Sequence, residues 1–209
     1  WSPDGRSLAF VSHREEEGCA IYVLPVYDGG EAVRLASWPE EIEALEWSPD
    51  GTRLAFLARD RDEEVYGKEA KDRPPRRITR LFNRLDSAGW TVDRPRHLFV
   101  VPADGASRPR MLTPGPFEVS GLAWSPDGSR VAFVSGRHPR ADLDLVTDIF
   151  TVDVELGGEP EAVTGSTDAW SEPSYGADGS LAAYWSDPAI SPTHAQVSVL
   201  PPAGGDPRF

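Results

Sequence analysis

One serine of the chain lies in a context that resembles a nucleophile motif. The segment Gly5-Arg6-Ser7-Leu8-Ala9 lacks only the final glycine of the G-x-S-x-G pattern, in which a strained turn between a strand and a helix presents a reactive serine. Ser7 corresponds to Arg53, Arg130 and Leu181 in three related segments described below, which places it in a hairpin. The sequence therefore predicts no catalytic residue in this chain.

No metal site can be read from the sequence. The four histidines are scattered along the chain: His13, His97, His138 and His194. They lack the paired short spacings that zinc sites require. Asp142, Asp144 and Asp148 form an acidic stretch, but the chain lacks the glycine and the terminal glutamate of a calcium-binding EF-hand loop. We therefore expect a solvated loop here, and neither a metal ion nor another cofactor.

Two clusters of charge could bind parts of a peptide. Glu15-Glu16-Glu17 could hold a free amino group, although consecutive acids in a turn are usually only solvated. Five arginines fall within twelve residues: Arg73, Arg76, Arg77, Arg80 and Arg84. Their forked donors could bind substrate carboxylates or carbonyls. In so acidic a chain, however, pairing with local acids or docking against a partner domain is favoured.

A repeated phrase shows which elements position these residues. The sequence WSPDG begins at Trp1, Trp47 and Trp124, and an altered copy, YGADG, begins at Tyr175. Ser, Pro and Gly at the first, second and fourth positions are typical of a type I turn, and a left-handed glycine after such a turn makes a tight hairpin. Each phrase therefore predicts two antiparallel strands joined by a hairpin.

The strands that follow each phrase are repeated as well. The second strand reads LAFVS at 8–12, LAFLA at 54–58, VAFVS at 131–135 and LAAYW at 181–185. Both faces of these strands are apolar, which favours a sheet packed between two others. Third strands recur at 21–24, 98–101, 149–152 and 197–200, and short fourth strands at 32–35, 110–113 and 162–164. Four-stranded units at this spacing are typical of β-propeller blades.

We therefore predict an all-β fold, a β-propeller fragment of about four blades, each a four-stranded antiparallel sheet. The blades span approximately residues 1–37, 38–114, 115–165 and 166–209. The repeats are spaced by 46 (47 − 1), 77 (124 − 47) and 51 (175 − 124) residues, so the second blade carries an insertion at approximately 60–96. Within it, Arg77–Phe82 could form an extra strand or a helical turn. Because both ends fall inside predicted blades, we expect incomplete terminal blades and further propeller in the parent protein.

Composition excludes some classes of partner. The chain has 209 residues, is 39% hydrophobic and carries a net charge of −13. It is rich enough in apolar residues to fold. Its acidity opposes binding to nucleic acids or anionic membranes, which depends on clustered Lys and Arg. It contains no apolar run of about 18 residues that would predict a membrane span. The single Cys19 excludes an internal disulfide and fits a reducing compartment.

The chain resembles the propeller domains of the prolyl oligopeptidase family of serine peptidases, in particular the acylaminoacyl-peptidase and dipeptidyl-peptidase-like branch. The WSPDG phrase also occurs in TolB-type propellers, and the insertion distinguishes the two. Its segments Arg76–Leu81, Arg84–Trp90 and His97–Val101 are similar to a stretch of those peptidases that precedes a His-Leu-aromatic-Val strand. Ser87 and Ala88 depart from the usual glycine pattern there.

The resemblance implies a propeller that covers an α/β-hydrolase domain of the same chain, which supplies the catalytic Ser, Asp and His. This chain would then be non-catalytic and would restrict access to short peptide substrates, with acylaminoacyl or dipeptidyl release by the parent. Arg84 and Asp86 are the predicted substrate-binding residues. The alternative is a stand-alone TolB-like or WD-type propeller that acts as a protein-interaction scaffold.

The remaining expectations concern cellular location and assembly. We expect a cytoplasmic protein, with a periplasmic or secreted protein as the alternative. The protein could also form a homo-oligomer.

Overall fold

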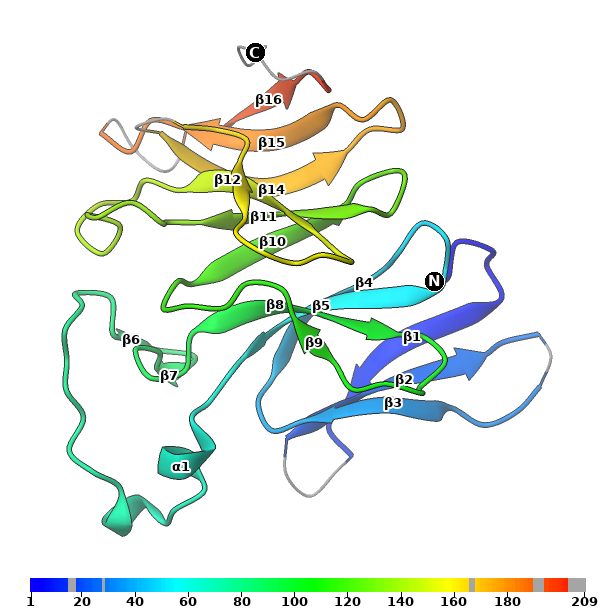
Figure 1. Ribbon diagram of the computed structural model, residues 1–209, viewed down its shortest axis with the longest axis horizontal. Helices are drawn as coiled ribbons and strands as arrows, with labels where there is room; N and C mark the ends of the chain where they lie inside the picture. Colours follow the sequence, from blue (N-terminus) through cyan, green and yellow to red (C-terminus); the bar gives the residue numbers. More distant parts are fainter. Residues whose placement is uncertain (15–17, 28, 166–167, 190–193, 203–209) are drawn as a thin grey trace.

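The computed structural model describes residues 1–14, 18–27, 29–165, 168–189 and 194–202. Four antiparallel sheets follow one another along the chain and lie side by side (Figure 1). We call them blades 1 to 4. Blade 1 contains β1 (Ser7–Ser12), β2 (Cys19–Pro25) and β3 (Val33–Trp38). Blade 2 contains β4 (Ile42–Trp47), β5 (Arg53–Arg59), β8 (Arg96–Pro102) and β9 (Arg110–Met111).

The other two sheets repeat this strand order. Blade 3 contains β10 (Val119–Trp124), β11 (Arg130–Ser135), β12 (Asp148–Asp153) and β13 (Glu161–Ala162). Blade 4 contains β14 (Ala169–Tyr175), β15 (Leu181–Ser186) and β16 (Gln196–Leu200). The predicted fold class is confirmed: the described residues form a partial β-propeller with two four-stranded inner blades and three-stranded outer ones.

The repeated phrase forms the predicted hairpin turn. In the turn before β5, the amide of Gly51 donates to the carbonyl of Ser48 at 2.9 Å, and Gly51 has a φ of 70°. The Ser48 hydroxyl donates to Asp50 Oδ1 at 2.6 Å, and the same oxygen accepts the amide of Thr52 at 3.0 Å. The turns before β1 and β11 repeat these bonds. The phrase thus specifies the turn through its side chains as well as its backbone.

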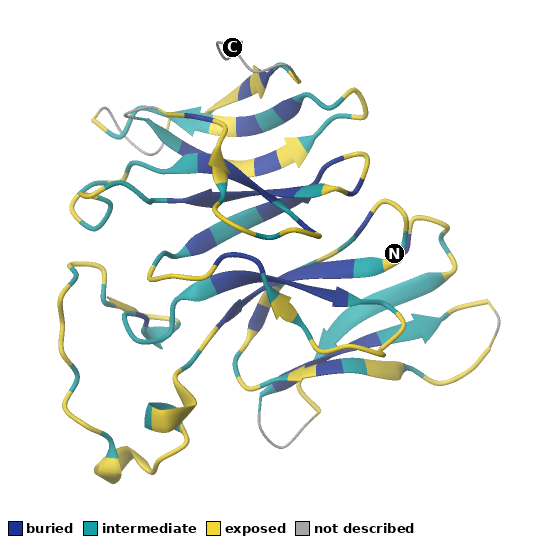
Figure 2. Ribbon diagram, in the orientation of Figure 1, coloured by how far each residue is buried: buried dark blue, intermediate teal, exposed yellow. Residues whose placement is uncertain are grey.

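Apolar layers between neighbouring blades form the core. Figure 2 shows the densest burial along the middle strands of blades 2 and 3. Alternate residues of β5 face opposite neighbours: Phe56 belongs to the layer shared with blade 1, and Ala55 and Leu57 belong to the layer shared with blade 3. A third layer joins blades 3 and 4 around Trp170. This arrangement explains why the second strands are apolar on both faces.

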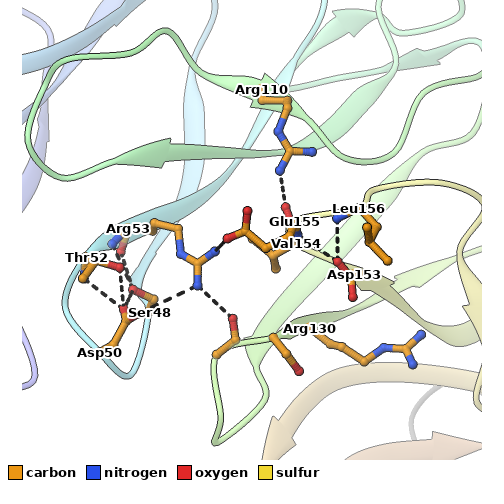
Figure 3. A network of polar contacts seen from close by, with 12 residues as sticks. Ser48, Asp50, Thr52, Arg53, Arg110, Arg130, Asp153, Val154, Glu155 and Leu156 are labelled. Atoms are coloured by element: carbon orange, nitrogen blue, oxygen red, sulfur yellow. Dashed lines mark hydrogen bonds and ion pairs between the residues drawn. The ribbon is translucent and has the colours of Figure 1, made fainter.

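Polar contacts also connect blades 2 and 3 (Figure 3). Arg53, at the start of β5, donates to the carboxylate of Glu155 and to the carbonyl of Gly128 at 3.1 Å. Its guanidinium also lies 5.6 Å from the ring centroid of Trp124. Arg110 of β9 donates to the carbonyl of Val154. The two arginines thus connect the second and fourth strands of blade 2 to blade 3.

The two edges of the blades carry different connections. The Ser-Pro-Asp-Gly turns lie on one face, drawn on the right of Figure 1, which we call the turn face. The long β5–β8 and β11–β12 connections lie on the opposite face, drawn on the left, which we call the loop face. Because every blade repeats the same strand order, connections between second and third strands emerge on the same face. The loop face therefore gathers the irregular segments.

The insertion after β5 has little regular structure. It contains α1 (Glu63–Tyr66), a 3₁₀ turn at Ala70–Asp72, and the small hairpin of β6 (Arg84–Leu85) and β7 (Gly89–Trp90). Residues 77–82 form neither the extra strand nor the helical turn expected from the sequence. No helix in the described parts of the chain is long and apolar enough to span a membrane.

Candidate functional site

A cavity of about 710 Å³ lies on the loop face, between the insertion and blade 3. Phe82, Leu85 and Thr91 of the insertion line one side, and the β11–β12 connection, residues 136–147, lines the other. The start of β10 adds Glu118 and Ser120. This volume is within the range of small-molecule sites, which are concave and mostly apolar with a few polar groups. The cavity is therefore the candidate site.

The floor of the cavity is fixed by hydrogen bonds between blades 2 and 3. Ser135 donates its hydroxyl hydrogen to the carbonyl of Glu118 at 2.8 Å. The Glu118 carboxylate accepts from Arg59 at 2.8 Å, and Arg59 also donates to the carbonyl of Arg94 at 3.1 Å. Arg59 is only 4% exposed, so the ion pair with Glu118 offsets a buried charge, although Nε of Arg59 has no hydrogen-bond partner. The acid at the floor is thus engaged within the protein.

A histidine and an aspartate form a pair in the wall. His138 Nε2 lies 2.9 and 3.2 Å from the two carboxylate oxygens of Asp144. A serine triad also needs a hydroxyl that the histidine can deprotonate. Ser135 shares the lining, but it donates to a carbonyl instead. The pair therefore orders the β11–β12 connection and completes no triad with Ser135.

Arg137 is the most unusual polar residue of the cavity. Its guanidinium carbon lies 4.8 Å from the ring centroid of Phe117, 5.5 Å from that of Phe133 and 5.4 Å from that of Phe150. Nε and Nη2 are buried and have no hydrogen-bond partner. Burial lowers the pKa of Arg137, and the charge of Glu159 opposes that shift. A guanidinium nevertheless stays protonated near neutral pH, so the cavity holds an incompletely satisfied cation.

The insertion is attached to the propeller mainly through arginines. Arg94 pairs with Glu40, Arg96 pairs with Glu43, and Arg80 donates to the carbonyl of Pro116. Arg80 and Arg96 also line the cavity. The insertion therefore forms a wall that is held at several points.

The arginine cluster mostly serves the insertion itself. Arg76 donates to Asp93 at 2.7 Å, and Tyr66 donates to the same carboxylate at 2.8 Å. Burial alone would raise the pKa of Asp93, but these hydrogen bonds hold it below its ordinary value. Arg73 lies over the ring of Tyr66 at 4.9 Å. These contacts agree with the expectation of local pairing.

The predicted substrate-binding residues lie outside the cavity lining. Arg84 is exposed, and its guanidinium lies 5.6 Å from the ring centroid of Trp90. Asp86 is also exposed, and neither residue lines the cavity, whereas Leu85 between them does. Their role in substrate binding stays a prediction. The segment Glu15–Glu17 lies outside the described residues.

Other candidates from the sequence are explained by structure. Ser7 begins β1, as the hairpin interpretation predicts. Among the acids of the predicted acidic stretch, Asp144 binds His138, and Asp148, at the start of β12, accepts from the Thr164 hydroxyl at 2.8 Å. The parts of the chain that the structure describes contain no group of three or more His, Cys, Asp or Glu arranged to hold a metal ion.

Sequence reasoning missed the residues that build the cavity. Arg137 lies two residues after the end of β11, and its Phe117 partner lies two residues before the start of β10. Neither residue belongs to a motif. A signal was nevertheless present, because a charged residue stands within three positions of the buried apolar run Val131–Val134.

The chain was compared with known proteins, and no family model matches it. A curated relative, the "Uncharacterized peptidase YuxL" of Bacillus subtilis, is 28% identical over 154 residues, which are 72% of this chain and 23% of the relative. The chain therefore aligns with less than a quarter of that protein's length.

Solved structures share the fold. A putative TolB from Agrobacterium tumefaciens has a TM-score of 0.62 at 21% identity, with 99% of this chain and 61% of that chain covered. A puromycin-hydrolyzing peptidase of Mycobacterium tuberculosis has a TM-score of 0.62 at 17% identity, with 99% and 27% covered. The resemblance noted in the sequence is thus confirmed, and the chain has the propeller fold found in TolB proteins and in peptidases of the prolyl oligopeptidase type.

Proposed function

We propose that this chain is the non-catalytic propeller segment of a serine peptidase, and that it controls which short peptides reach a hydrolase domain of the same protein. The observation that carries this proposal is the alignment with a Bacillus subtilis relative described as a peptidase. Most of that relative's length lies outside the alignment, which leaves room for a catalytic domain there.

The geometry of the chain supports a role in access. Ser7 lies in a strand. The hydroxyl of Ser135 donates to a backbone carbonyl, so Ser135 is not a nucleophile for the His138–Asp144 pair. The loop face holds the insertion and the cavity, whereas the turn face holds short, similar hairpins. A domain that covers an active site excludes large substrates and helps to expel water from the reaction centre. The irregular face is the one suited to meet substrate.

Removal of the insertion tests this proposal. The amide of Asp60 donates to the carbonyl of Pro95 at 3.0 Å, and Arg59 pairs with Arg96 across β5 and β8. Replacing residues 62–94 by a short Asn-Gly turn should therefore preserve blade 2. In the intact protein we expect kcat/KM for a decapeptide to change several-fold relative to that for a dipeptide. Hydrolysis of a small chromogenic ester should stay close to the wild-type rate.

The control keeps the insertion at its full length. Lys71→Ala changes a side chain of the insertion that is 75% exposed, so it should leave both peptide rates unchanged. Equal effects of the deletion on the dipeptide and the decapeptide would show that the insertion does not select substrates by length.

A second function is favoured by the TolB structures, which match the chain as well as the peptidase does. In that case the propeller would act as a stand-alone scaffold for protein interactions. Labelling of the intact protein with a serine-directed fluorophosphonate distinguishes the two functions. Covalent labelling that requires a serine outside this chain supports the peptidase, and the absence of labelling favours the scaffold.

A further inference from the structure

The unsatisfied guanidinium of Arg137 needs a physical explanation. Buried N–H groups without partners destabilise a fold, and the penalty is larger for charged groups. Nε and Nη2 of Arg137 are both in this state. A methionine would avoid the penalty, because it has no N–H donor. Such residues in a native protein commonly serve binding or catalysis, where local stability is sacrificed for function.

The surroundings of Arg137 hold its charge without neutralising it. The rings of Phe117, Phe133 and Phe150 attract the cation through their faces. Phe133 and Phe150 are stacked on each other, with centroids 5.9 Å apart. Aromatic faces do not accept hydrogen bonds as a carboxylate does. Nε and Nη2 of the guanidinium therefore lack a protein acceptor, although both are covered.

Most other charged groups of the cavity are already paired. Glu118 binds Arg59, Asp144 binds His138, and Arg96 binds Glu43. Arg80 donates to a carbonyl, so it lends positive charge to the lining without an ion pair among the described residues. Asp142 also lines the cavity and would repel an anion. Arg137 and Arg80 are therefore the cations of the lining that could attract an anion, and Arg137 is the one with donors that lack an acceptor.

Apolar side chains line another part of the cavity, beside hydroxyl groups such as that of Thr91. Phe82 and Leu85 of the insertion and Leu145 of the β11–β12 connection all line the cavity, and each is about half exposed. Exposed apolar side chains around a concave site indicate that a ligand covers them. The complementary ligand has an apolar group beside its charge.

We propose that this cavity binds a carboxylate attached to an apolar group, with Arg137 as the residue that binds the carboxylate. Nε and Nη2 form one edge of the guanidinium, and such an edge binds a carboxylate through two parallel hydrogen bonds. Both atoms are covered in this structure, so the side chain must turn toward the cavity as the ligand enters. The two charge-assisted hydrogen bonds to the carboxylate favour that rotation of the side chain.

The peptide form of this inference rests on the proposed function. For a peptidase, the ligand would be a short peptide that presents either its C-terminal carboxylate or an acidic side chain next to an apolar residue. The binding chemistry itself does not depend on catalysis, because Arg137 and the cavity belong to this chain.

The test uses 3-phenylpropionate and its amide as matched probes, titrated calorimetrically into the intact protein. The acid should bind, and the amide should bind at least tenfold more weakly because it lacks the charge. Equal affinity of the two probes, or no binding of the acid, would overturn the proposal. Neither measurement requires peptidase activity, so the result stands even if the protein is no peptidase.

Variants locate the binding site. Arg137→Gln should lower the affinity for the acid at least tenfold, and Arg137→Lys should restore part of it, because an ammonium keeps the charge but not the fork. Arg140→Gln, a neighbouring exposed arginine, is the matched control and should bind as the wild type does. Asp142→Asn should strengthen binding. Wild-type affinity in both Arg137 variants would overturn the proposal.

Stability provides an independent measurement. Arg137→Met removes the unsatisfied donors and should raise the thermal unfolding midpoint of the ligand-free protein. The acid probe should raise the midpoint of the wild type and leave that of Arg137→Met unchanged. An acid-induced rise of the same size in both proteins would place the binding site elsewhere.

Two peptides distinguish the sources of the carboxylate. One has its C-terminal group as its sole carboxylate, and the other is an amidated peptide whose sole carboxylate is a glutamate side chain. If the first peptide inhibits peptide hydrolysis by the wild type but not by Arg137→Gln, the cavity recognises the C-terminus. The same pattern for the second indicates recognition of an acidic side chain.

Discussion

At the scale of single residues, the aspartates of the repeated turn are coupled to folding. Hydrogen bonds from Ser48 and Thr52 lower the pKa of Asp50 from 3.8 to about 2, and bonds from Ser125 and Ser129 do the same for Asp127. These hydrogen bonds require the folded turn. The ionised carboxylate is therefore favoured by the native state, and protonation weakens the turn.

The sign of the pH dependence follows from these shifts. Because the folded pKa lies below the unfolded value, the two acids contribute their full stability above about pH 4 and lose it as the pH falls toward about 2. We expect Asp50→Asn combined with Asp127→Asn to reduce the loss of unfolding free energy over that interval, measured by urea denaturation.

The control for this experiment is an exposed acid outside the turns. Glu31→Gln should leave the pH dependence of the wild type unchanged. If the double variant and the wild type lose stability in parallel, the turn aspartates are not the source of acid sensitivity.

The turn could be predicted from sequence, but the cavity could not. Ser, Pro, Asp and Gly act on neighbours within five residues, so their pattern alone specifies the turn. The environment of Arg137 depends on Phe117, Phe133 and Phe150, which approach it only after blade 3 has formed. Long-range contacts of this kind leave no local pattern.

At the scale of elements, the layer between blades 2 and 3 combines apolar packing with the bonds of Arg53. One of these bonds reaches the Gly128 carbonyl, and the guanidinium also contacts Trp124. Arg53 is 20% exposed, whereas Glu155 is 78% exposed. Exposed ion pairs contribute little because water screens them. The carbonyl bond and the ring contact should therefore matter more than the ion pair.

Two variants separate these contributions. Arg53→Met should lower the free energy of unfolding by about 1 to 2 kcal/mol, because it removes a partly buried charged hydrogen bond and a cation–π contact. Glu155→Gln should lower it by less than about 0.5 kcal/mol. Urea denaturation of both variants measures the difference. Equal losses would show that the exposed ion pair is the main contribution.

The insertion shows the limit of element prediction. Its length was readable from the spacing of the turns, but Arg77–Phe82 has no regular structure. Neither an alternating nor a helical pattern of apolar residues runs through it, and side chains such as Arg80 and Arg94 anchor it to distant parts of the chain. Its course therefore depends on the folded blades.

At the scale of the whole molecule, exposed apolar residues occur on both the loop face and the turn face. Leu81 of the insertion is 64% exposed, and Leu143 of the β11–β12 connection is 60% exposed. Leu156, in the β12–β13 connection on the turn face, is 87% exposed. If the loop face meets the substrate or another domain, leucines there are covered in the working protein.

Matched substitutions test which of the two faces is functional. In the intact protein, Leu143→Ser should change kcat/KM for a peptide several-fold, because it removes an apolar contact on the loop face. Leu156→Ser should leave kcat/KM unchanged despite its greater exposure. A larger effect of Leu156→Ser would place the functional surface on the turn face.

The separation of the two faces has a consequence for how such a protein can diverge. Side-chain hydrogen bonds within the hairpins stabilise the turn face. The segments on the loop face contain little regular secondary structure, so fewer of their residues are fixed by strand pairing. Ligand preference can then drift by lengthening or rewriting those segments, without renewed selection for foldability.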